Sequence, residues 1–152
     1  MRRLAVLLLL AGVAPGSAAW AAEAGERWVA ASNTASSITG DVRFSSGRIR
    51  FANGASLELA SVSPLPRFRA NGETVAAMAY RVVTPADPLL LNGNRLCGGP
   101  DKPQKVTFIV VWGPRKLPGD AAPRSFAAFS GAQPTAGTGD AGACGTFNYD
   151  RP

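Results

Sequence analysis

The chain has 152 residues, a net charge of +6, two cysteines and no histidine. The lack of histidine excludes the usual Ser–His–Asp and Cys–His catalytic arrangements and the Cys/His zinc sites. The length suits one domain.

The N-terminal segment 1–21 has the order of a secretory signal peptide. A basic start is followed by an apolar run over 4–14 and by small residues that end at Ala19-Trp20-Ala21. The apolar run is shorter than the ~20 residues that a membrane-spanning helix needs, and no longer run follows. We expect cleavage after Ala21, with Ser17-Ala18-Ala19 as the alternative motif. Residues 22–152 then form one periplasmic or secreted domain of net charge +4.

The clearest β pattern covers residues 26–59. A short strand is expected around Trp28, and apolar and polar residues then alternate over 38–44 and 49–59. A period of two is typical of half-buried antiparallel strands. We therefore predict a three-stranded meander after the first strand.

The parity of the apolar residues constrains both turns of this meander. A four-residue loop, Ser45 to Arg48, pairs Phe44 with Ile49 and keeps both side chains on one face. A three-residue loop over 52–54, with a left-handed glycine at its end, pairs Ile49 with Leu57.

The second half of the chain contains further strand patterns. The Pro-rich segment 63–68 predicts a corner, and 73–83 predicts a strand rather than a helix because no helix N-cap precedes it. A turn-rich connection over 84–103 follows, in which Leu89 to Leu91 form a short strand or a plug over the core. Three more strands are expected, at 105–112, 125–131 and 144–150.

No long amphipathic helix interrupts these strands. The fold class is therefore mainly β, one domain of about seven or eight short antiparallel strands, arranged as a small barrel or a sandwich. The aromatic side chains predicted for the core are Phe108, Trp112, Phe126 and Phe129. Trp28 and Tyr149, near the chain ends, are expected to pack at the core or its edge, with an exposed contact patch as the alternative.

Cys97 and Cys144 are the only cysteines. An even pair in an oxidising compartment predicts a disulfide, and no Cys-x-x-Cys redox spacing is present. The bond closes a loop of nearly fifty residues, for which the chain-entropy estimate is about 4 kcal/mol.

The predicted meander places like charges opposite each other. Arg43 faces Arg50 on the outer side, which is unfavourable, whereas Arg48 faces Glu58. Asp41 is expected to relieve part of the charge of Arg43, and an anion bound between the two arginines would relieve it directly. Arg43, Arg50 and Arg48 are therefore the candidate binding residues, and a solvated arginine pair is the alternative.

Several stretches, SITGDVRF, LLLNGNRLCGG, FAAFSG and CGTFNY, resemble those of small exported proteobacterial proteins of uncharacterised function. The resemblance implies a secreted protein with one disulfide, and it implies no activity.

The sequence predicts a binding module rather than an enzyme. The Ser-x-x-Lys, phosphate-loop and dinucleotide motifs are missing, and we expect no cofactor, no metal site and no specific nucleic-acid binding. The expected partner is an anionic envelope component or a periplasmic protein. A structural cell-envelope protein and a hydrolase that uses carboxylates only are the alternatives.

Overall fold

The computed structural model describes residues 25–113, 123–133 and 136–152. The predicted signal peptide, 1–21, lies outside the described residues, as does most of the loop predicted between the strands at 105–112 and 125–131. Within the described part, no helix combines the length and the apolar character needed to cross a membrane.

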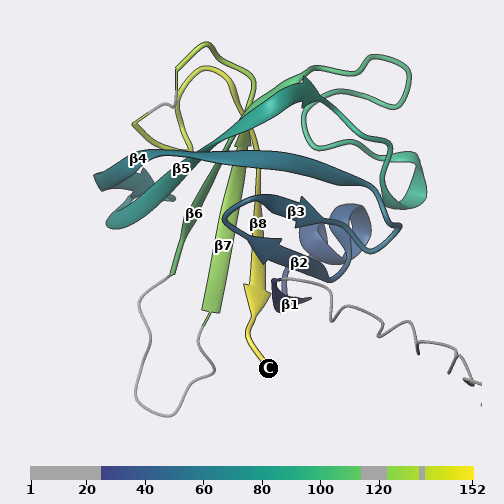
Figure 1. Cartoon of the computed structure of the whole chain (residues 1–152), viewed down its shortest axis with the longest axis horizontal. Helices are drawn as coiled ribbons and strands as arrows, with labels where there is room; N and C mark the ends of the chain where they lie inside the picture. The colour runs from purple at the N-terminus through teal and green to yellow at the C-terminus, as the bar shows by residue number, and fades with distance from the viewer. Residues whose placement is uncertain (1–24, 114–122, 134–135) are drawn as a thin grey trace, which may run out of the picture.

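Eight antiparallel strands follow one another in chain order and close into a barrel (Figure 1). The prediction of a mainly β domain is confirmed, and the architecture is the barrel rather than the sandwich. The strands are β1 (Glu26–Ala30), β2 (Val42–Ser45), β3 (Arg48–Arg50), β4 (Ser56–Ala70), β5 (Glu73–Ala86), β6 (Val106–Trp112), β7 (Pro123–Phe129) and β8 (Ala143–Asp150). A short π-helix, η1 (Ala35–Thr39), and a 3₁₀ turn, η2 (Leu91–Gly93), lie in the connections.

The predicted meander is present as β2, β3 and β4. Phe44 pairs with Ile49, and Ile49 pairs with Leu57, in the predicted registers. Gly54 has a φ of 90°, the left-handed conformation expected for the end of its turn. The first turn is shorter than predicted, because Ser45 pairs with Arg48 and only the two residues between them form the loop.

The predicted Pro-rich corner is wrong. Strand β4 runs through it for 15 residues, and two register shifts against β5, between Ser61 and Ser63 and between Leu65 and Phe68, absorb the irregularity. Among the described strands, β3 pairs with β4 only at 56–58, so the edge of β4 that faces away from β5 makes no ladder over 63–67. Proline is tolerated at such an edge, since no N–H is needed there.

Two apolar clusters stabilise the barrel. The larger one contains Trp28, Ile49, Phe126 and Tyr149 and fills the interior. The second one lies on the other face of β6 and β7. There Phe68 of β4, 1% exposed, contacts Trp112 and Phe129 with ring centroids 5.4 and 6.2 Å apart. Every aromatic side chain predicted for the core is buried, and Trp28 and Tyr149 are also buried in it.

The connection after β5 is organised by one buried carboxylate. Asp87, 6% exposed, accepts hydrogen bonds from four backbone N–H groups, those of Leu96, Cys97, Gly98 and Gln104, at 2.6–3.2 Å. Of the segment predicted as a short strand or a plug, Leu89 to Leu91, no residue lies in a strand and only Leu90 is buried in the interior cluster, whereas Leu89 is exposed. The disulfide between Cys97 and Cys144 is confirmed, and it joins this connection to the start of β8.

Candidate functional site

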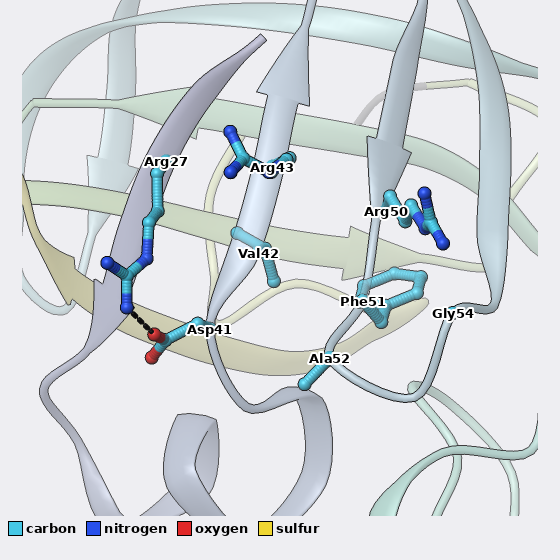
Figure 2. A pocket seen from close by; sticks show the side chains of 8 residues that line it. All are labelled: Arg27, Asp41, Val42, Arg43, Arg50, Phe51, Ala52 and Gly54. Atoms are coloured by element: carbon cyan, nitrogen blue, oxygen red, sulfur yellow. Dashed lines mark hydrogen bonds and ion pairs between the residues drawn. The ribbon is translucent and has the colours of Figure 1, made fainter. Parts of the chain in front are cut away.

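Three arginines form a row across three neighbouring strands. Arg27 of β1 pairs with Arg43 of β2, and Arg43 pairs with Arg50 of β3. Their sequence neighbours Trp28, Val42 and Ile49 are buried, so the arginine side chains lie on the outer face. We call these three residues the arginine row (Figure 2).

The arginine row borders a hollow of about 210 Å³. Phe51, only 3% exposed, contributes an apolar wall, and Gly54 of the following turn lies at its border (Figure 2). Small-molecule sites usually measure about 300–1,000 Å³. The hollow therefore suits one small chemical group better than a whole ligand.

Asp41 lies at one end of the arginine row and holds Arg27. Its carboxylate accepts a 3.0 Å hydrogen bond from the backbone N–H of Ala30 and a 2.8 Å charged hydrogen bond from Nη2 of Arg27 (Figure 2). The bond from Ala30 and the one from Arg27 lower the pKa of Asp41 below its ordinary value. Asp41 therefore stays charged at neutral pH. Asp41 forms an ion pair with Arg27, a partner that the sequence pattern did not point to.

Arg43 and Arg50 lie opposite each other as predicted, at strand positions whose Cβ atoms are about 4.5–5.5 Å apart. Arg48 does not join them. It forms an exposed ion pair with Glu58, with 3.4 Å between Nη2 and Oε1, and it does not line the hollow. Sequence reasoning missed Arg27, although its place between Glu26 and the apolar Trp28 already indicated an outward side chain.

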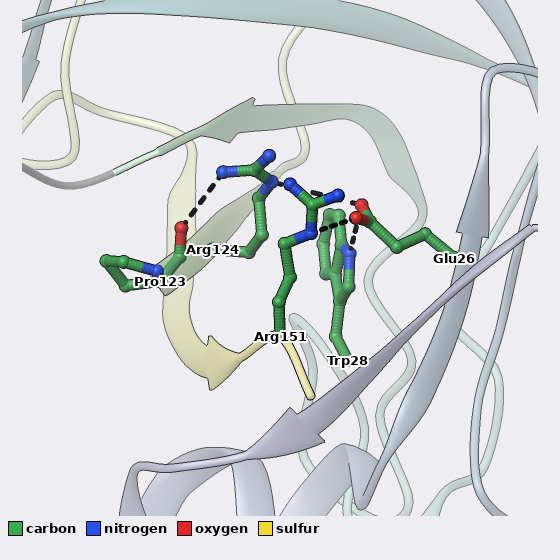
Figure 3. A network of polar contacts seen from close by, with 5 residues as sticks. All are labelled: Glu26, Trp28, Pro123, Arg124 and Arg151. Carbon is green, nitrogen blue, oxygen red and sulfur yellow. Dashed lines mark hydrogen bonds and ion pairs between the residues drawn. The ribbon is translucent and has the colours of Figure 1, made fainter. Parts of the chain in front are cut away.

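The strand that carries Arg27 is fixed by a polar network around Glu26 (Figure 3). The indole N–H of Trp28 donates to Glu26 at 2.8 Å, and the guanidinium of Arg151 forms an ion pair with it. Arg124 of β7 lies 3.9 Å from the same carboxylate. The indole of Trp28 also stacks on Phe44, with centroids 4.8 Å apart. These contacts join β1 to β2, β7 and the C-terminal residues.

Within the part of the chain that the structure describes, no three His, Cys, Asp or Glu side chains come close enough together to hold a metal ion. Comparison of the chain with protein-family models, curated proteins and solved structures finds no match.

Proposed function

We propose that this protein is a non-catalytic binding module of the periplasm or the extracellular space, which recognises an anionic group at the arginine row. The observation that carries the proposal is the alignment of Arg27, Arg43 and Arg50 along one hollow. Like charges at directly opposed strand positions are unfavourable, and a bound anion turns that repulsion into attraction.

The chemistry of arginine supports an oxyanion as the ligand. A guanidinium is planar and carries several N–H donors, so it binds carboxylate or phosphate through two parallel hydrogen bonds. A guanidinium that already holds one partner still has further donors: Arg27 uses Nη2 for Asp41. The small hollow favours a phosphate, sulfate or carboxylate group that projects from a larger envelope component.

Titration with inorganic phosphate at low and high salt tests this proposal. The signals to follow are the Nε–H resonances of the arginines in NMR spectra. The test variant is Arg43→Gln/Arg50→Gln. The matched control is Arg48→Gln/Arg81→Gln, which removes two exposed arginines outside the hollow and gives the same net charge.

We expect the test variant to bind phosphate at least about tenfold more weakly than the control. Equal weakening in both variants would mean that phosphate senses only the net charge, an effect that salt screens. That result would reject the binding module and favour the structural envelope protein.

A further inference from the structure

A second hollow, of about 390 Å³, lies apart from the arginine row and shares no lining residue with it. It is formed where the β4–β5 turn approaches the end of β6 and the outer faces of β7 and β8. Asn71 lines it from the turn, Glu73 from β5, Trp112 from β6 and Asn148 from β8. Its volume falls within the range of about 300–1,000 Å³ that is usual for small-molecule sites.

This groove has a buried floor and a polar rim. Ala70, Trp112 and Ser125 line it and are at most 5% exposed. The side chains of Glu73 and Asn148 line it from exposed positions. A largely apolar base with a few convergent polar groups is the usual composition of a ligand site.

The polar groups of the rim are partly fixed in direction. The hydroxyl of Ser125, 1% exposed, donates to Oδ1 of Asn148 at 2.7 Å. This bond turns the carbonyl of the Asn148 amide toward Ser125 and the NH₂ group away from it. Arg124, which also lines the groove, donates to the backbone carbonyl of Pro123 at 3.1 Å (Figure 3).

The charge of the groove differs from that of the arginine row. Two carboxylates, Glu73 and Asp150, and one guanidinium, Arg124, line it. An anion therefore gains little here, and the backbone of a nucleic acid would meet both carboxylates. The rim offers N–H donors from Asn148 and carboxylate acceptors from Glu73 and Asp150.

A neutral sugar ring fits this combination. Each hydroxyl of a sugar is both a donor and an acceptor, so it pairs with amide and carboxylate groups in turn. The C–H face of the ring is apolar and suits the apolar part of the lining, to which Ala31, Ala70, Val75 and Trp112 contribute. We infer that the groove between the β4–β5 turn and β8 binds a neutral saccharide unit, independently of the arginine row.

The experiment uses the purified, oxidised protein and two neutral probes, cellotriose and triacetylchitotriose, each raised to about 10 mM. NMR spectra report the indole N–H of Trp112 and the side-chain NH₂ of Asn148. We expect saturable shifts of both signals with at least one probe. If neither signal shifts with either probe, the inference is wrong.

Variants connect the binding to these residues. Glu73→Gln/Asp150→Asn replaces two exposed carboxylates by amides of the same shape, and we expect saccharide affinity to fall about tenfold. The single variant Glu73→Gln changes only one exposed side chain and should weaken binding in the same direction. Unchanged affinity in both groove variants would reject the site.

The Arg43→Gln/Arg50→Gln variant separates this inference from the proposed function. It should bind the saccharide as the wild type does while losing phosphate. An equal loss of saccharide binding in this variant would mean that the groove is not an independent site.

Discussion

At the scale of single residues, Asp41 controls the charge of the arginine row. Its carboxylate orients Arg27 and places one negative charge beside the hollow. The hydrogen bond from Ala30 needs only an acceptor, which an asparagine side chain also supplies. An asparagine at position 41 therefore removes the negative charge and keeps both the shape of the side chain and its hydrogen bond from Ala30.

Asp41→Asn should strengthen phosphate binding about fivefold, because removing a unit charge at about 4 Å in water is worth about 1 kcal/mol. Titration by calorimetry measures the change. Asp101→Asn is the control, since it removes the same charge from an exposed position outside the hollow. Equal gains in the two variants would show that only the net charge matters.

Tyr149 is a second residue whose pKa differs from its ordinary value. Burial raises its pKa, and its hydroxyl shares a 2.6 Å hydrogen bond with Thr39, which is also buried. The unfolded chain ionises this tyrosine near its ordinary pKa of 10.0, whereas the folded protein keeps it neutral. Its contribution to stability is therefore complete below pH 10 and is lost as the pH rises further.

Tyr149→Phe should reduce the free energy of unfolding at neutral pH by about 1 kcal/mol, for one lost hydrogen bond. Urea unfolding of both proteins across a pH series measures this difference. The stability of the variant should then fall less steeply above pH 10 than that of the wild type, since only the wild type has a buried phenol hydroxyl at this position to ionise on unfolding. If the free energies of unfolding of the two proteins fell equally steeply above pH 10, burial of the Tyr149 hydroxyl would not cause the pH dependence.

At the scale of elements, the β4–β5 hairpin has two roles. The part of the hairpin that lies away from its turn belongs to the barrel wall. The part that contains the turn covers the outer face of β6 and β7 through Phe68. Strands β6 and β7 are therefore buried on both faces, which accounts for the unbroken apolar runs over 108–112 and 126–129.

Phe68→Ala should lower the free energy of unfolding by about 3–5 kcal/mol, as expected for an aromatic side chain removed from a packed cluster. The fluorescence of Trp112 should also shift to the red, because the ring that covers it is lost. The neighbouring Arg67 is exposed, and Arg67→Ala should change stability by no more than about 0.5 kcal/mol. Similar small effects of both variants would mean that the hairpin does not cover the sheet.

At the scale of the whole molecule, closure of the barrel depends on contacts between its first and last strands. Strand β1 pairs with β8 at only two positions, and the network around Glu26 adds side-chain contacts at the same junction. The disulfide fixes the long connection after β5 to β8, at a separation of 47 residues.

Removing the disulfide with Cys97→Ser/Cys144→Ser should cost about 2–4 kcal/mol of stability. Urea unfolding with and without reductant measures this difference, and reductant should affect only the wild type. The folded variant should still bind phosphate, since the arginine row lies on β1, β2 and β3. A variant as stable as the oxidised protein would show that the bond does not stabilise the fold.

The pattern of the sequence determined most of the strands, the registers of the meander and the pairing of Arg43 with Arg50. Side-chain alternation and turn length act over a few residues, so parity alone leaves one consistent arrangement. The disulfide followed from the cysteine count in the expected compartment.

Tertiary structure alone decided closure into a barrel, the addition of Arg27 to the row and the passage of β4 through its prolines. It also decided the four backbone bonds to Asp87, whose donors lie nine to seventeen residues further along the chain. Each depends on which strand or loop lies alongside another. Such pairings join residues distant in the chain, and their free energy comes from burial and hydrogen bonds that exist only once the sheet has closed.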